Sequence, residues 1–469
     1  MKKIILCAFV LLSTFAVSTF AQPGGGGGGT SSSVSYPHGA ALLITSGGSY
    51  KDQTYSQTAS DYNVVKDTCA TATLTNCTLK KTGATASSGD ASSFYGINAG
   101  VYVSTKGVLT MKGGSITTDA DGANAAFCYN GGTLNLYDVT IYNSATRSRG
   151  LHCTGGNGAT INAYNCTVTT TKATSSTIAT DRGGGTVYVN GGTYTANGAK
   201  CAIVYSTGDM TVKKIKGYSN NTSEGDIADI EGDNNITIDS CNLTCSGTSR
   251  GVMLYQSGSG DASGYNPTMK ISHSNLTLVS SAAPFCEVST AVNAFLTLNA
   301  DTITAPSGVL AYVHTNTNWN NTNNKYLNLQ LKGSTYYGAL NADATGAIYV
   351  NVASDAVWQG TIDNASTARV DTVVVNGTWI MDGASNVDVL IINSGAKVYT
   401  NGYTLTATKT TKNGTLDTTT TGVAASISQV NVAASSAKSG KIYSLDGKIM
   451  DSANLPKGIY IQNGTKFVK

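Results

Sequence analysis

The chain has few charged residues, few prolines and few histidines for its length. Of its 469 residues only 12% are charged, six are proline and four are histidine, and the formal net charge is +3. A nearly neutral chain without a basic stripe is poorly suited to the phosphates of a nucleic acid. With so few histidines and no Cys-x-x-Cys pair, a zinc site is also disfavoured. We therefore expect no nucleic-acid partner and no metal held by cysteine and histidine.

Long apolar runs are confined to the amino terminus. Two lysines precede an apolar run from Ile4 to Val17, and small residues follow as far as Ala21. This order is typical of a secretory signal peptide, and the run is too short to span a bilayer. We expect residues 1–21 to be removed and residues 22–36 to form a glycine-rich linker. The mature protein should then have no transmembrane span and be secreted or attached to the outer-membrane surface.

The cysteines give an odd count after this cleavage. Ten cysteines become nine, because Cys7 lies in the signal peptide, so at least one thiol has no partner within the chain. We expect the cysteines to be buried as small residues or joined in structural disulfides, and their spacing does not assign the pairs.

Helical periodicity is missing after the signal peptide, and a repeat of about 26 residues is present instead. A turn residue, then Ser, Thr or Asn, then an apolar residue recurs over eight coils, for example as Val139-Thr140-Ile141 and Cys166-Thr167-Val168. Three short alternating strands per repeat, separated by Gly, Asn and Asp turns, predict one coil of a three-faced solenoid. Alternation places Leu134 and Leu136 inside and Asn135 outside.

The predicted fold class is therefore all-β, a right-handed parallel β-helix over residues 37–405. A series of β-sandwiches is the competing fold. That fold predicts strands joined by hairpins at a spacing of roughly 8–12 residues. It gives no reason for the repeat of about 26 residues to stay in phase over eight coils.

The tail differs in pattern from the body. Residues 406–438 are rich in Thr and Ser and are expected to be a linker or the start of a sorting domain. In residues 439–469, Asp446-Gly447 predicts a hairpin, Pro456 to Gly458 a turn, and the last residues a final strand pair.

This tail resembles the C-terminal sorting domain of type IX secretion. Three features carry the resemblance: Tyr443 with Gly447, the Leu-Pro-x-Gly-Ile-Tyr sequence from Leu455 to Tyr460, and the basic end from Lys466 to Lys469. The resemblance implies that secretion machinery binds the tail, which is then removed, and that the body is released or fixed to surface lipopolysaccharide. An ordinary β-hairpin cap is the alternative.

The body resembles right-handed β-helix proteins, which include pectate-lyase-like enzymes and surface adhesins. In the enzymes, carboxylates and basic residues lie on neighbouring coils of one outer face, which makes Asp181, Arg182 and Glu231 the catalytic candidates, with Asp261 in a nearby loop. Carboxylates two coils apart are ~10 Å apart, the wide limit for an inverting hydrolase. Calcium is the one cofactor such oxygen ligands would suit, and otherwise no cofactor is expected. Solvated turn charges are the alternative.

Aromatic residues suggest a binding face instead. Tyr129, Tyr205 and Tyr255 are expected to form a ladder on the third strand of successive coils. Two long coils insert loops beside it, and these loops carry or adjoin the remaining ligand-binding candidates, which are Asp261, His314 and Trp319. Planar rings near polar side chains suit sugars, which pair an apolar face with hydroxyl edges. The alternative is that tyrosine simply favours strands.

We therefore expect an adhesin-like, non-catalytic protein that binds an extracellular polysaccharide or a host or cell-surface glycan. One alternative is a polysaccharide lyase or glycoside hydrolase acting on the β-helix face. A second is a structural surface stalk.

Overall fold

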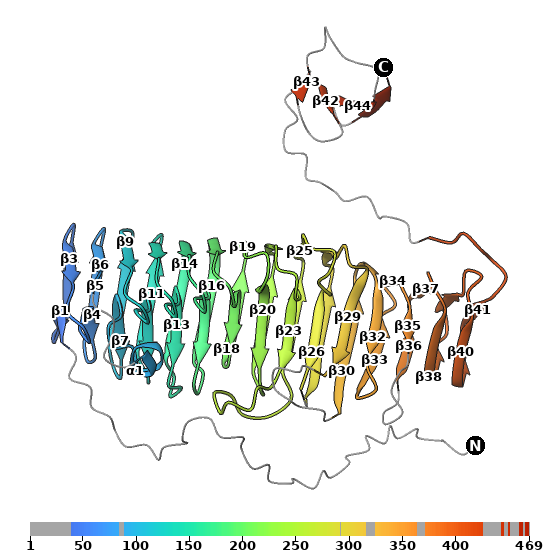
Figure 1. The fold of residues 1–469 in the computed structure, drawn as a ribbon, viewed down its shortest axis with the longest axis horizontal. Coiled ribbons are helices and arrows are strands. Elements are labelled where there is room, and N and C mark those ends of the chain that lie inside the picture. The colour runs from blue at the N-terminus through green and yellow to red at the C-terminus, as the bar shows by residue number, and fades with distance from the viewer. Residues whose placement is uncertain are drawn as a thin grey trace, which may run out of the picture. The chain divides into compact units, whose positions relative to one another are not determined.

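The computed structural model describes residues 39–83, 89–290, 292–315, 324–363, 371–424, 442–444, 449–450, 459–462 and 465–468. In the body, strands of successive coils pair in parallel, and three sheets run along the stack (Figure 1). The predicted all-β solenoid is confirmed.

Sheet A has 13 strands, one for each of about 13 coils, and every pair in it is parallel and nearly in register. Its strands are β1 (Ala40–Ile44), β4 (Asn63–Asp67), β7 (Val101–Ser104), β10 (Ala126–Tyr129), β13 (Leu151–Thr154), β15 (Ile178–Asp181), β17 (Cys201–Ser206), β20 (Gly225–Glu231), β23 (Val252–Tyr255), β26 (Cys286–Ser289), β29 (Val309–His314), β32 (Ala339–Ala342) and β35 (Ile362–Asp363).

Sheet B has 23 strands and forms two faces, because β14 and β16 run continuously around the corner between them. Its strands are β2 (Gly48–Lys51), β3 (Thr54–Gln57), β5 (Thr71–Thr75), β6 (Thr78–Lys81), β8 (Val108–Lys112), β9 (Ser115–Thr118), β11 (Thr133–Tyr137), β12 (Thr140–Asn143), β14 (Thr160–Thr170), β16 (Thr186–Ala196), β18 (Asp209–Lys213), β19 (Lys216–Ser219), β21 (Asn235–Asp239), β22 (Asn242–Cys245), β24 (Thr268–Ser272), β25 (Asn275–Leu278), β27 (Asn293–Asn299), β28 (Thr302–Thr304), β30 (Lys325–Lys332), β33 (Gly346–Val352), β36 (Thr372–Val375), β38 (Ser385–Ile392) and β40 (Leu405–Lys412).

Sheet C takes over one face in the later coils. Its strands are β31 (Thr335–Tyr337), β34 (Val357–Gln359), β37 (Thr378–Ile380), β39 (Lys397–Tyr399) and β41 (Thr415–Asp417). The solenoid thus continues through Asp417, beyond the predicted end at residue 405. The sequence missed this coil because β40 lies at the edge of its sheet and is largely exposed, so its threonines and lysines show no buried alternation.

The tail forms a separate antiparallel sheet in the order β43-β42-β44-β45. Its strands are β42 (Ile442–Ser444), β43 (Ile449–Met450), β44 (Ile459–Gln462) and β45 (Thr465–Val468). The antiparallel pairing of β42 with β43 confirms the predicted hairpin, and that of β44 with β45 confirms the final strand pair.

The helix α1 (Gly89–Tyr95) was not expected from the sequence. It spans seven residues, too few to show a helical period, and lies at the β7 to β13 part of the stack (Figure 1). Its Phe94 carbonyl accepts a hydrogen bond from Thr154 Oγ1 at 2.8 Å, and Ala91 is fully buried. The helix therefore covers part of the outer face of sheet A.

The core consists of columns of like side chains. Leu134 pairs in register with Leu109 and Ile161, and all three are fully buried. On the outside, Asn162 Nδ2 donates to Asn135 Oδ1 at 2.9 Å. The predicted inward and outward assignment of residues 134–136 is confirmed.

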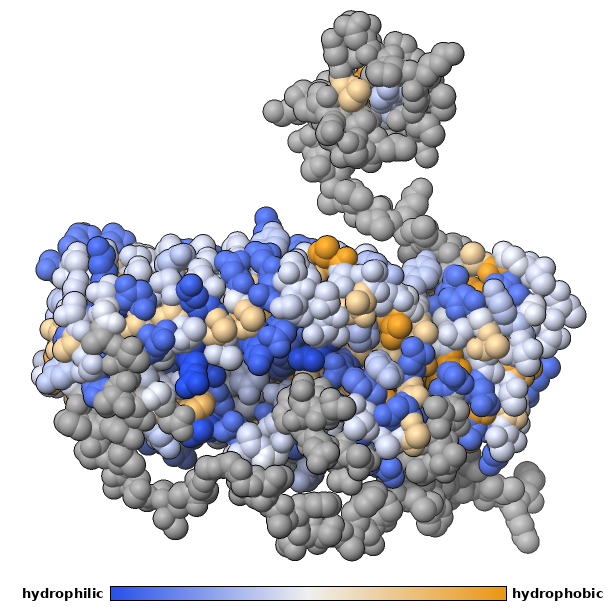
Figure 2. Space-filling model, viewed as in Figure 1, coloured by the Kyte–Doolittle hydropathy of each residue, from blue (hydrophilic) through white to orange (hydrophobic). Residues whose placement is uncertain are grey.

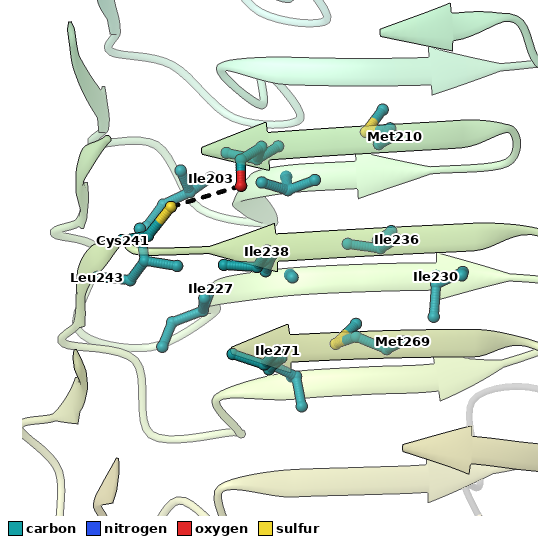
Figure 3. Close-up of a cluster of buried hydrophobic side chains, with 14 of the residues drawn as sticks. Ile203, Met210, Ile227, Ile230, Ile236, Ile238, Cys241, Leu243, Met269 and Ile271 are labelled. Atoms are coloured by element: carbon teal, nitrogen blue, oxygen red, sulfur yellow. Dashed lines mark hydrogen bonds between the residues drawn. The ribbon is translucent and has the colours of Figure 1, made fainter. Parts of the chain in front are cut away.

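Nine described cysteines are free thiols, and eight of them are buried. Cys241, for example, lies at an inner corner, where its thiol donates to the Asp239 carbonyl at 3.3 Å and to Val212, one coil earlier, at 3.6 Å (Figure 3). Gly192 occupies the same corner one coil after Cys166. At its φ of +97° a Cβ there would overlap the Cys166 carbonyl. The corner therefore leaves no room for a side chain at Gly192, although Val139 and Ile215 occupy the same corner in other coils.

We expect Leu136→Ala to lower the free energy of unfolding by about 2–5 kcal/mol, because the cavity cannot collapse between rigid coils. Thr140→Ala, which changes an exposed position of β12, should change it by less than about 0.5 kcal/mol. Denaturant unfolding followed by circular dichroism measures both. Equal effects would contradict the column-packed core.

Candidate functional site

Buried charges gather on the outer face of sheet A, although charged residues are scarce in the chain. Asp181, Asp226, Glu231 and Glu287 are each at most 5% exposed. The face of the stack in Figure 2 is mostly hydrophilic or neutral, with its most hydrophilic residues toward the middle. Since burying an unpaired carboxylate is costly, the partners of these groups show what each can do.

The strand register places these residues in two outward columns. Asp181 continues the column of Tyr129 and Thr154, while Glu231 pairs with Tyr255. The neighbouring column runs through Ala179, Tyr205, Asp229, Met253, Glu287 and Tyr312. The catalytic candidates predicted from the sequence therefore do share one face.

Asp181 is engaged in a buried ion pair. Its Oδ2 accepts a hydrogen bond from Arg149 Nη2 at 3.1 Å. Burial raises the pKa of Asp181 to about 6, outweighing the opposite effect of the Arg149 charge. The carboxyl is thus partly protonated near neutral pH. Its main contact, the ion pair with Arg149, is a structural one.

Arg182 links helix α1 to the long loop after β23. Its backbone has a positive φ of 38°, and its Nε donates to Asp261 Oδ1 at 3.1 Å. The guanidinium carbon lies 3.6 Å from the centroid of the Phe94 ring, a cation–π contact. Arg182 and Asp261 are therefore brought together as predicted, in a pair that fastens two covering segments.

Glu231 anchors the same loop. Its Oε1 accepts hydrogen bonds from the Ser257 amide, at 2.9 Å, and from the Ser257 hydroxyl. Ser259 Oγ in turn donates to Asp261 Oδ2 at 3.0 Å. Burial raises the pKa of Glu231, and hydrogen bonds from Ser257 and Tyr255 oppose that shift. The loop is thus held near its start by Glu231 and at its middle by Arg182.

The three predicted tyrosines do not form one ladder. Tyr205 lies in the neighbouring column, where its hydroxyl is hydrogen-bonded to that of Tyr255. Tyr129 packs instead against Phe127, with ring centroids 6.4 Å apart, and edge-on against Tyr95 at 6.0 Å. Tyr255 is 7% exposed. Tyr129 and Tyr205 are half-buried, so the three rings present no continuous exposed ladder to a ligand.

A second group of charges was missed by the sequence analysis. Arg250 bridges two carboxylates, with Nη2 3.1 Å from Asp226 Oδ2 and Nη1 3.2 Å from Glu287 Oε2. Burial raises the pKa of Asp226 to about 6, and that of Asp229, which also faces Asp226, well above its usual value. The protonated form of Asp229 is therefore favoured beside this charged network.

An open groove of about 520 Å³ lies beside Arg250. Tyr312 and His314 stack on one wall with ring centroids 4.1 Å apart and planes 11° apart, and Tyr312 is 36% exposed. His314 Nε2 lies 3.4 Å from Glu287 Oε1. The lining residues are Ser249, Arg250, Ala282, Pro284, Glu287, Tyr312, His314 and Thr315. The groove pairs an aromatic platform with hydrogen-bonding groups at its edge.

Of the predicted ligand-binding residues only His314 lines this groove, and Trp319 lies outside the described residues. The signal that could have identified Arg250 is its place two residues before β23, in the turn from which it reaches carboxylates of the neighbouring coils. The contact between Asp226 and Asp229 could not be predicted from the sequence. Residues three apart on a strand point to opposite faces unless the strand is irregular.

Within the described residues, no three His, Cys, Asp or Glu side chains are grouped closely enough to hold a metal ion. No described helix has both the length and the apolar character needed to cross a membrane.

The buried carboxyls predict a pH dependence of stability. Because the folded-state pKa of Asp181 is about 6 against 3.8 for a free side chain, between these values the folded protein binds a proton that the unfolded chain has released. Its contribution to the free energy of unfolding is therefore present below about pH 4 and is lost as the pH rises to about 6. A shift of this size corresponds to at most about 3 kcal/mol.

Denaturant titrations from pH 4 to 8 test this. Asp181→Asn should remove part of the decline, whereas Asp52→Asn, at an exposed turn, should keep the wild-type profile. A wild-type and an Asp181→Asn profile that run parallel would contradict it.

The chain was compared with models of protein families, with curated proteins and with solved structures, and none of them matches it.

Proposed function

We propose that this chain is an exported β-solenoid that binds an extracellular polysaccharide or a host or cell-surface glycan, in the manner of an adhesin and without catalysis. The observation that carries the proposal is the groove beside the Tyr312–His314 stack. A pyranose ring can pack an apolar face on an outer ring face of this stack while its hydroxyls meet polar groups at the edge. Arg250, whose side chain stays 20% exposed beside its ion pairs with Asp226 and Glu287, lies at the edge of this platform.

The engagement of the predicted catalytic residues also supports a binding role. Asp181 is paired with Arg149, Arg182 with Asp261, and Glu231 with Ser257. A general acid or base must reach the substrate within hydrogen-bonding distance, and these three groups instead hold their own coils and loop.

The tail supports the export part of the proposal. Its sheet holds the strands that the resemblance to type IX sorting domains implies, with Tyr460 buried within it. On this proposal the machinery of that pathway binds residues 439–469, the tail is removed, and the body is secreted or surface-attached.

One observation favours an enzyme as the second candidate. Burial and the neighbouring Asp226 raise the pKa of Asp229 well above its usual value, as suits a general acid, and Asp229 shares a column with Glu287 two coils away, at ~10 Å between backbones. That spacing is at the wide limit for an inverting glycoside hydrolase.

To test glycan binding, the purified protein is screened on a glycan array and the best ligand titrated by calorimetry. Tyr312→Ala should weaken binding about tenfold, because the stacking face is lost. Tyr137→Ala is the matched control, since Tyr137 is 37% exposed on sheet B and lies away from the groove. Equal loss in both variants contradicts a site at the groove, and no binding to any glycan favours a surface stalk.

The same ligands are assayed for new reducing ends and for unsaturated uronides. Turnover that Asp229→Asn abolishes would replace the adhesin proposal with the hydrolase. Turnover abolished by Glu231→Gln would instead return catalysis to the residues identified from the sequence.

The export proposal predicts that deletion of residues 439–469 leaves the protein inside a bacterium that has type IX secretion. A chain that lacks only Gly24 to Gly29 should still reach the medium or the cell surface. Immunoblots of medium, surface and periplasmic fractions measure this. Equal export of both chains would show that the tail is an ordinary cap.

A further inference from the structure

We propose that Cys128 and Cys153 form a disulfide bond that ties the coil of β10 to the coil of β13 when the protein folds in an oxidising compartment. The structure records both as free thiols. The bond is independent of glycan binding and depends, in the cell, on the proposed export.

The strand register brings the two residues together. Cys128 and Cys153 are direct partners in the parallel pairing of β10 with β13. Neighbouring strands lie ~4.8 Å apart, within the ~4.4–6.8 Å between Cα atoms that a disulfide spans. Both side chains face the core and are fully buried, and the two thiols lie within hydrogen-bonding contact of each other.

Gly185 leaves room for the sulfur atoms on the next coil. A Cβ at Gly185 would overlap Cys153 Sγ, so any larger residue there would displace the thiol. Gly185 also has a φ of +147°, which side chains rarely adopt.

The other described cysteines lack such a partner. Cys77, Cys166 and Cys241 share one corner column, but each is three coils from the next, or ~14 Å. Cys286 is a register partner of Val252 and Ala311, Cys201 of Gly225, and Cys245 of Ser219 and Leu278. Cys69 is exposed and suited only to bonds between molecules.

The reaction is a two-electron oxidation. The two thiols lose two protons and two electrons to a disulfide-bearing oxidant, and one sulfur–sulfur bond forms while that of the oxidant breaks. A protein oxidant becomes a dithiol, and glutathione disulfide becomes two glutathione thiols. Burial and the neighbouring thiol raise the pKa of Cys153 well above its usual value, so the folded core holds little thiolate. The bond therefore has to form before these coils close.

The test refolds the denatured, reduced full chain in a glutathione redox buffer, alkylates free thiols and maps tryptic peptides by mass spectrometry. We expect the peptide 113–147, which contains Cys128, to be linked to the peptide 150–172. Fragment sequencing then separates Cys153 from Cys166, since both lie in the second peptide. Reduction should lower the melting midpoint by several degrees.

Cys286→Ala is the matched control, since it removes a buried cysteine of the same sheet that has no cysteine partner. It should keep both the link and the reductant-sensitive midpoint, whereas Cys128→Ala should lose both. Folded wild-type protein in which Cys128 and Cys153 are both alkylated, or in which another pair is linked, would overturn the proposal. Because this refolding needs no export, such a result is distinct from failure of the secretion experiment.

Discussion

The backbone hydrogen bonds between successive coils are the constraint on which the rest of this structure depends. The Val101 amide, for example, donates to the Ala125 carbonyl of the next coil at 2.8 Å. One isolated coil would leave such groups unpaired at both edges, so stability comes from the stack. Because the pairing is parallel and in register, each residue lies directly beside its counterpart on the next coil. Every column of the solenoid must therefore accept its members at a fixed separation of ~4.8 Å.

That separation explains which residue types occupy which column. Inner columns accept Leu, Ile, Val and Met, and the corner column that holds Val139 and Ile215 also accepts Cys, Gly and Ser, of which Cys241 and Ser274 donate to a carbonyl two residues earlier. Like charges cannot stack at such a distance without opposite charges between them. On the outer face of sheet A, Arg149 and Arg250 come from turns rather than strands and reach carboxylates on neighbouring coils. The buried ion pairs thus relieve a repulsion that the stack itself creates.

The repeat could be predicted from the sequence because inward positions such as Leu134 and Leu136 repeat with the coil, and the tail hairpin because Asp446-Gly447 is a strong local signal. The last coil could not be predicted, since an exposed edge strand such as β40 needs no alternation of apolar and polar residues. The site was predicted only in part. The shared face was predicted for Asp181, Arg182, Glu231 and Asp261. Their pairing partners, such as Arg149, were not, because they depend on the strand register, and a register predicted from sequence is uncertain by one residue. Insertions of different length before β24 and β30 add to that uncertainty.

Two parts of the outer face of sheet A differ in how far their polar groups are covered. Where α1 and the loop after β23 cover sheet A, polar groups are satisfied within the protein: Glu231 accepts two hydrogen bonds from Ser257, and Arg182 contacts Asp261 and Phe94. Three coils further on, no described segment covers the Tyr312–His314 stack to the same degree, and Tyr312 remains 36% exposed. A ligand gains most from surfaces that folding has left open, since groups already paired must first be released. The covered part therefore offers few unpaired groups, whereas the groove beside Tyr312 and His314 leaves part of an aromatic ring exposed.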